Sequence, residues 1–208
     1  MTKIIDILIV VIYFLILLKV FRKMIKEINQ GIFILIDKSS LDLQISEQKL
    51  EDIIEIRFYF ASSYRNQSLS AISLELTNKS STHSIYVNWQ YSTFTDAYKQ
   101  SQRLFYHVPG LTIDFFQPQV FTVIAAEQTL NARIVTQSCL SRDEETGELT
   151  IQYPIFNWQE LNMNRSFYLY LVFQVSEPIY KTQEINLNTL KCKFNIKKIP
   201  WQEVIYWN

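Results

Sequence analysis

The 208-residue sequence predicts an all-β protein, an immunoglobulin-like antiparallel β-sandwich preceded by one N-terminal transmembrane helix. Residues 7–18 (ILIVVIYFLILL) form an apolar run without a charged residue, which is typical of a membrane helix. From residue 31 onward, apolar residues recur at every second position, which is the period of a half-buried strand. Turn residues separate these segments, and no convincing amphipathic helix lies between them, as in a sandwich. We therefore expect a helix with a basic extension at residues 1–30 and a sandwich domain at residues 31–208.

The N-terminal apolar segment has the length of a membrane crossing. Residues 4–21 include only Asp6 and Lys19 as charges, and as a helix they extend about 27 Å, near the thickness of a bilayer's hydrocarbon core. No small-residue cleavage site follows the apolar run, which argues against a signal peptide. The alternative is a buried strand or core helix, but strands rarely run this long. Four residues represent the expected anchor: Ile7, Val11, Phe14 and Leu18.

The charges beside this segment predict its orientation. Lys and Arg near a membrane helix favour the cytoplasmic side, and four of them follow the apolar run: Lys19, Arg22, Lys23 and Lys26. We therefore expect a single-pass protein with the bulk of the chain in the cytoplasm and the lipid bilayer as one partner. The net charge of zero is then a sum of a basic N-terminal segment and a mildly acidic domain. Asp6 is either a functional carboxylate within the membrane or, as we favour, a residue that reaches the headgroups.

The strand segments follow in order along the rest of the chain. Segment 53–60 (IIEIRFYF) places four apolar residues on one face and Glu55 and Arg57 on the other. Segments 72–77 and 85–90 repeat the pattern around a short polar loop, so we expect them to pair as an antiparallel hairpin. Further strands are predicted at Phe33–Ile36, Leu41–Ile45, Leu111–Phe116, Val120–Ala125, Ala132–Gln137, Leu149–Tyr153, Phe167–Val175 and Lys191–Ile196.

Two of these segments indicate where the core lies. Segment 167–175 (FYLYLVFQV) is apolar on both faces, so it belongs in the middle of a sheet. Trp89 lies on the inward face of its strand, like the core Trp of immunoglobulin-like sandwiches. Turns are expected at Pro109-Gly110, at Gln117-Pro118 and at residues 142–148. Segment 92–108 is a polar excursion that ends in aromatic residues and receives no assignment.

Several function classes are excluded by composition. The three glycines lie tens of residues apart, so neither a dinucleotide fingerprint nor a phosphate-binding loop is present. The zero net charge, with no basic run after residue 26, argues against nucleic acid as a partner. Cys139 and Cys192 lie too far apart for a zinc ribbon or a redox pair. Cys192 falls on the apolar face of its strand, where it is expected to act as a small buried hydrophobe.

No residue pattern points to catalysis or to a metal. His83 and His107 lack a nucleophile motif around them, and with the two cysteines they lack metal-ligand spacing. The acidic loop 143–148 has its carboxylates in the wrong order for a calcium loop, so it is expected to be solvated. We therefore predict a protein that is not an enzyme and has no cofactor and no metal. A hydrolase would require one of the histidines to meet a carboxylate or a serine in a pocket.

The C-terminal segment 199–208 (IPWQEVIYWN) is unusually aromatic for a chain end. Trp201, Tyr206 and Trp207 either anchor at the membrane interface or dock into a partner, since aromatic residues suit both places. The alternative is that this segment packs back over the sandwich. Both interpretations stay open.

Two segments, 87–96 (VNWQYSTFTD) and 109–121 (PGLTIDFFQPQVF), resemble an uncharacterised group of cyanobacterial single-pass membrane-anchored proteins. The resemblance covers about residues 70–135. It implies a cyanobacterial source and a thylakoid or plasma-membrane location, and it carries no catalytic residue over to this chain.

These observations predict a membrane protein whose cytoplasmic sandwich binds or scaffolds a membrane protein complex, such as an accessory or assembly subunit of a photosynthetic complex. The alternative is a sandwich that binds a lipid or pigment between its sheets or beside one aromatic cluster: Phe105, Tyr106, Phe115 and Phe116.

Overall fold

The computed structural model describes residues 2–28, 32–62, 64, 68–156, 165–176 and 187–198. Over these residues the helices and strands follow in chain order: α1 (Thr2–Ile28), β1 (Ile32–Ile36), α2 (Lys38–Glu47), β2 (Ile54–Tyr59), β3 (Ile72–Asn78), β4 (Ser84–Thr95), β5 (Ser101–Tyr106), β6 (Thr122–Ile124), β7 (Thr129–Thr136), the short 3-10 helix η1 (Gln137–Cys139), β8 (Leu140–Arg142), β9 (Leu149–Ile151), β10 (Ser166–Ser176) and β11 (Leu187–Lys198).

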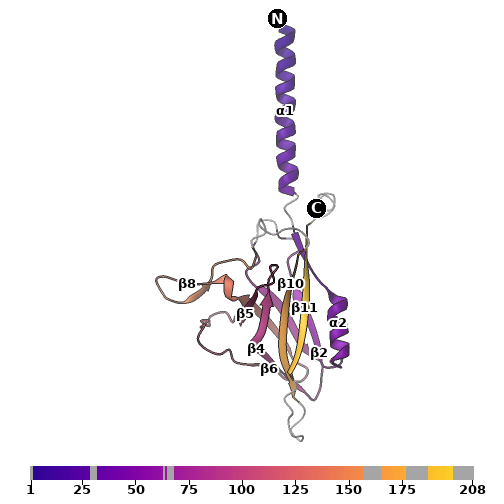
Figure 1. The fold of residues 1–208 in the computed structure, drawn as a ribbon, viewed down its shortest axis with the longest axis vertical. Helices are drawn as coiled ribbons and strands as arrows, with labels where there is room; N and C mark the ends of the chain where they lie inside the picture. Colours follow the sequence, from indigo (N-terminus) through magenta and orange to yellow (C-terminus); the bar gives the residue numbers. More distant parts are fainter. Residues whose placement is uncertain are drawn as a thin grey trace.

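The described strands form one large antiparallel sheet that nearly closes on itself (Figure 1). Its order is β1-β11-β10-β4-β5-β7-β3-β2, with β6 paired to β4, while β8 and β9 form a separate hairpin. β5 joins the two layers because residues 101–103 pair with β4 and residues 104–106 pair with β7. At the other side, a bridge between Ile32 and Tyr64 links β1 to the segment after β2. The all-β antiparallel prediction is confirmed, and the immunoglobulin-like comparison stays a prediction.

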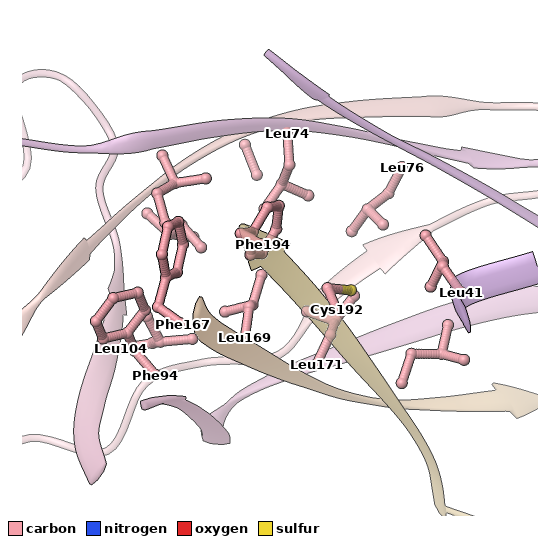
Figure 2. Close-up of a cluster of buried hydrophobic side chains, with 14 of the residues drawn as sticks. Leu41, Leu74, Leu76, Phe94, Leu104, Phe167, Leu169, Leu171, Cys192 and Phe194 are labelled. Atoms are coloured by element: carbon pink, nitrogen blue, oxygen red, sulfur yellow. The ribbon is translucent and has the colours of Figure 1, made fainter. Parts of the chain in front are cut away.

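The core fills the space between the two layers (Figure 2). Phe194 on β11 lies at its centre, with ring centroids 4.9 Å from Phe58 and 4.8 Å from Phe167. Leu41 on α2 enters the same cluster as Leu76 and Cys192. The inward faces predicted for β2 and β3 are correct, and β10 lies inside the sheet between β11 and β4, as its two apolar faces predicted.

α2 replaces a predicted strand and covers an open sheet edge. Segment 41–45 alternates like a strand, but Asp37 accepts a hydrogen bond from the Ser40 N–H at 3.2 Å and begins a helix that buries Leu41 and Ile45. β1 ends at Ile36, opposite Phe194, so residues 187–193 of β11 have no paired strand on that side within the described part of the chain. The Gln44 side chain fills that gap: its amide nitrogen donates to the Lys191 carbonyl at 3.0 Å and its oxygen accepts from the Lys191 N–H at 2.9 Å.

Gln48 extends this coverage one helical turn later, where its amide donates to the Thr189 carbonyl at 3.0 Å. Since an unpaired sheet edge exposes backbone donors and acceptors, α2 serves as a side-chain substitute for a strand. The prediction of no helix within the domain was therefore wrong.

The predicted hairpin between β3 and β4 is also wrong, because the two strands lie in different layers. β3 pairs with β2 and β7, and β4 pairs with β10, β5 and β6. The buried Asn78 at the end of β3 explains the crossing: its side-chain amide donates to the carbonyls of His83 (2.7 Å), Ile124 (3.1 Å) and Ala125 (3.0 Å). These bonds hold the connecting loop against the opposite layer.

Four further details differ from the sequence pattern. Segment 111–116 is a loop, and an isolated bridge joins its Ile113 to Leu149 of the β8–β9 hairpin. The strand predicted at 120–125 is reduced to β6, and the unassigned segment 92–108 contains the end of β4 and all of β5. Asn88, placed outward by simple alternation, is buried because β4 bulges opposite residues 170–172. The Ser92 hydroxyl repairs the ladder there by accepting from the Val172 N–H at 3.0 Å and donating to the Asn88 carbonyl at 2.7 Å.

Candidate functional site

α1 is a 27-residue helix that projects away from the β domain (Figure 1). Its apolar residues from Ile7 to Leu18 are all exposed, each by 39–66%. The four predicted anchor residues are therefore uncovered by any described part of the chain: Ile7, Val11, Phe14 and Leu18. Across the described residues, no helix combines the length and the apolar character that crossing a membrane requires.

The predicted basic residues follow this apolar stretch on the same helix. Lys19, Arg22 and Lys23 have exposed side chains, and Lys26 lies in the last turns of α1, where its side chain falls outside the described part. The helix thus presents an apolar half and a cationic half in sequence. β1 begins only four residues after α1 ends, so at about 3.5 Å per residue the β domain lies within about 14 Å of the end of the helix.

A second apolar surface lies on the long loop between β5 and β6. Phe116 is 88% exposed and Val120 is 83% exposed, and three further exposed apolar residues flank them: Leu111, Phe121 and Val123. We call these five residues the apolar loop surface. Isolated exposed apolar residues are common, whereas a contiguous group of them is a candidate interaction site. The apolar pattern predicts strands at 111–116 and 120–125, whereas the turns predicted at Pro109-Gly110 and Gln117-Pro118 border the loop that the structure has there. Gly110 has φ +85°.

Polar side chains fix this loop to the strands beneath it. The Gln119 side chain accepts from the Tyr106 N–H at 2.9 Å and donates to the Leu104 carbonyl at 2.5 Å. β5 pairs with β4 only over residues 101–103. Beyond them, the Gln119 side chain bonds the backbone of Leu104 and Tyr106 in place of a neighbouring strand. Arg103 adds a second tether, donating to the Phe115 carbonyl at 2.9 Å and to Gln90 at 3.2 Å. These bonds hold the loop against the strands at Phe115 and at Gln119.

A groove of about 450 Å³ lies between the apolar loop surface and the strands. Its floor includes Trp89, which stacks on Tyr106 with 5.0 Å between ring centroids and donates its indole N–H to the Thr122 hydroxyl at 2.7 Å. The predicted aromatic cluster does not stay together. Phe105 is buried against Phe115 at 5.4 Å, whereas Phe116 faces away into solvent.

The two histidines lie in separate surroundings. His83 contacts the hydroxyls of Ser80 (2.9 Å) and Thr82 (3.0 Å) through its Nδ1 atom, within the loop after β3. His107 has a buried Nδ1 atom without a hydrogen-bond partner, and burial together with the Arg133 charge lowers the pKa of its imidazole. Among the described residues, no group of three or more His, Cys, Asp or Glu side chains is placed to hold a metal.

The acidic loop forms the turn of the β8–β9 hairpin. One Asp143 carboxylate oxygen accepts from the N–H groups of Glu145 (3.0 Å) and Thr146 (2.8 Å) and from the Thr146 hydroxyl (3.0 Å). These bonds lower the pKa of the Asp143 carboxyl. The carboxylate is thus occupied in holding the turn, as the sequence turn signal at 142–148 predicted.

The sheet buries both thiols. Cys192 is fully buried, and the lack of water around it raises the pKa of its thiol to about 12. Cys139 is also fully buried, where burial raises its pKa and its sulfur lies 3.0 Å from the Thr136 hydroxyl. The expectation that Cys192 is a small buried hydrophobe is confirmed.

Because both thiols are buried, we expect them to react slowly with thiol reagents. Since the thiolate is the reactive form, we expect both cysteines to react with a thiol reagent at pH 8 only when the chain unfolds. Because the pKa of Cys192 is higher in the folded chain than its usual value of 9, the stability linked to its proton is present below pH 9 and is lost as the pH rises toward 12. Chemical unfolding at pH 8 and pH 10.5 checks this: the native chain should lose about 2 kcal/mol more than Cys192→Ala. An equal loss in both chains would contradict it.

The predicted C-terminal contact residues lie outside the described residues: Trp201, Tyr206 and Trp207. Neither the docked nor the packed interpretation of that segment is tested, and both stay predictions.

Comparison with family models, curated proteins and solved structures finds no match for this chain. The function of this chain must therefore be inferred from its own surfaces and side chains. The chain combines an uncovered apolar helix with a tethered loop that carries exposed apolar residues beside a groove.

Proposed function

We propose that this chain is a non-enzymatic, single-pass membrane protein that uses α1 as its anchor and the apolar loop surface to bind a membrane protein complex. The observation that carries the proposal is the uncovered apolar run of α1 from Ile7 to Leu18. The described helix as a whole does not reach the combined length and apolar character of a membrane crossing, so the proposed anchor rests on this run alone. Apolar surface in water costs about 25 cal/mol per Å², so a helix of this kind needs an apolar medium around it. A bilayer supplies that medium on every side of the helix.

The charges of α1 support an orientation for the anchor. The apolar run lies toward the N-terminus, and the cations at Lys19, Arg22 and Lys23 follow it. Cations next to a membrane helix favour the cytoplasmic side and attract anionic headgroups. In the proposed orientation the β domain is cytoplasmic and is held close to the membrane by the short connection to β1.

The apolar loop surface supports the nature of the partner. Interfaces are enriched in aromatic residues at their centres, and Phe116 and Phe121 supply two exposed rings on a loop fixed by Gln119 and Arg103. A pre-formed loop loses little conformational entropy when it binds. Because the domain is held at the membrane, a protein within that membrane is the most accessible partner. The sequence resemblance extends this proposal to a photosynthetic complex.

Purification of the full chain in mild detergent from its native membranes tests the partner. We expect a co-purifying membrane protein that is lost, by at least about tenfold, when Phe116 and Val120 are both changed to Asp, since a charge at an interface centre must be desolvated. The matched control is Leu43→Asp, at an apolar residue on α2 that is 59% exposed. Recovery of a lone monomer, or equal loss with the control, would contradict the proposal.

A second candidate function is favoured by the groove beneath the loop. Its volume of about 450 Å³ falls within the range of small-molecule sites, and Trp89 and Tyr106 line it, so a lipid or pigment is the alternative occupant. Organic extraction of the purified chain distinguishes the two. A bound lipid or pigment that disappears after Tyr106→Ala, at a ring that lines the groove, would favour this second function over the protein partner.

A further inference from the structure

Among the described residues, part of the β2 backbone has no hydrogen-bond partner. It pairs with β3 on one side, with Ile54 opposite Asn78, and the Lys79 N–H donates to the Ile53 carbonyl at 2.8 Å. In an antiparallel pair, backbone groups point alternately toward the partner strand and away from it. Glu55, Arg57 and Tyr59 therefore point toward β3, and Ile56 and Phe58 point away. No described residue forms a hydrogen bond with the backbone of Ile56 or Phe58.

These unpaired groups border a groove of about 680 Å³ between β2 and α2. Every residue of β2 lines it. On the side of the core, the groove is lined by Ile36, Leu41 and Ile45, which are apolar. On the solvent side, its rim carries charges of both signs: Lys38, Asp42, Glu51, Glu55, Arg57 and Lys79.

At the other end of the sheet, where β11 extends beyond β1, the exposed backbone groups have hydrogen-bond partners. On β11, the Asp37 N–H donates to the Lys193 carbonyl at 2.8 Å, Gln44 bonds the backbone of Lys191, and Gln48 bonds that of Thr189. Within the described part of the chain, side chains thus cover the backbone of β11, and the outer backbone groups of β2 stay uncovered. Proteins usually cover or interrupt such edges, so an open edge inside an apolar groove indicates a binding position.

We propose that this groove binds an extended segment of another protein, which adds to β2 as a further strand. Only an extended backbone offers alternating donors and acceptors at the spacing of Ile56 and Phe58. Side chains of that segment that point inward meet Ile36, Ile56 and Phe58, which line the groove and are half-buried. Those that point outward meet Glu55 and Arg57. The segment that fits is therefore amphipathic, with an apolar residue at every second position. This site is separate from the apolar loop surface.

A tethered peptide tests the proposal on the full chain in detergent. The Glu51→Cys variant places an exposed thiol at the groove, and the native thiols stay buried, so a peptide can be attached there by a disulfide. The probe is a ten-residue peptide with a terminal Cys and with Val at every second position, alternating with Thr or Lys. Tethering raises its local concentration to the millimolar range. We expect amide hydrogen exchange at Ile56 and Phe58 to slow about tenfold.

Two controls make this result specific. The amides of Glu55 and Arg57 already pair with β3, so their exchange should stay unchanged. The same peptide, with the backbone nitrogens that face β2 methylated, should give no slowing. Equal slowing by the methylated peptide, no slowing by either peptide, or slow exchange at Ile56 and Phe58 before tethering would each overturn the proposal.

A protein-side variant provides an independent arm. Ile56→Pro removes an N–H that the fold does not use, and Pro is tolerated at such edge positions. We expect it to abolish the slowing at Phe58, while Ile56→Val preserves it. If Ile56→Pro fails to fold, the methylated peptide still decides the question without any change to β2. Loss of the partner at the apolar loop surface would leave this result unaffected, so the two proposals fail separately.

Discussion

Changing both Val11 and Phe14 to Lys is expected to release the chain from membranes into the soluble fraction. Both residues lie within the uncharged run of α1 and have exposed side chains. A Lys near the centre of a membrane helix costs about 2.5–3.5 kcal/mol, so two of them cost about 6 kcal/mol, which corresponds to more than about 10⁴-fold in partitioning. Sedimentation of carbonate-washed membranes measures the change.

The matched control replaces the same two residues with Leu, which preserves the apolar character of the helix and should leave the chain in the membrane pellet. A double-lysine variant that sediments with the membranes as fully as the native chain would show that α1 is not the anchor. Release of the Leu control would indicate that a specific protein contact, rather than lipid, covers the helix.

Phe194→Ala is expected to produce the largest loss of stability in the β domain. Its ring contacts Phe58 and Phe60 near one edge of the sheet and Phe167 on β10, so it joins the two layers. Removing a fully buried Phe ring costs about 3–5 kcal/mol through lost burial and the cavity left behind. Urea unfolding of the detergent-solubilised chain, followed by tryptophan fluorescence, measures the loss.

Phe116→Ala is the matched control for this prediction, because the same substitution is made at a ring that is 88% exposed. Its free energy of unfolding should stay within about 0.5 kcal/mol of the native value. Equal destabilisation by the two substitutions would show that the core is not centred on Phe194, or that the loop around Phe116 is part of it.

Strands with one buried face were predictable from sequence. β2 and β3 alternate cleanly because each strand has one face toward the core and one toward solvent. β10 was recognised by a different signal, since it is apolar on both faces and lies inside the sheet. In each case the pattern of side chains records the local environment directly.

Strand pairing and α2 were not predictable by the same reasoning. A polar loop between two alternating segments predicts a hairpin, but the pairing depends on Asn78, whose amide bonds reach residues more than 40 positions away. In α2, Leu41 and Ile45 are compatible with a strand and with one helix face alike. The Asp37 cap was the sequence signal for the helix, and the bonds of Gln44 to β11 become visible only in three dimensions.

The candidate site was predicted in part. The apolar run and the cations of α1 are consecutive in sequence, so composition alone identifies them. The apolar loop surface was missed because Leu111, Phe116 and Val120 have the composition of buried strands. Gln119 on the loop bonds the backbone of β5, and Arg103 on β5 bonds Phe115 on the loop and Gln90 on β4. These contacts hold the loop in place, and a local sequence pattern does not reveal them.

Site-specific photocrosslinking in native membranes tests the central claim most directly. A photoreactive phenylalanine analogue at Phe116 should form an adduct with a membrane protein, and the same analogue at Leu43 should not. The adduct at position 116 should also disappear when Val11 and Phe14 are changed to Lys, because the domain then leaves the membrane. No adduct at position 116, equal adducts at both positions, or an adduct that persists without the anchor would contradict the proposal that α1 holds this domain against a membrane partner.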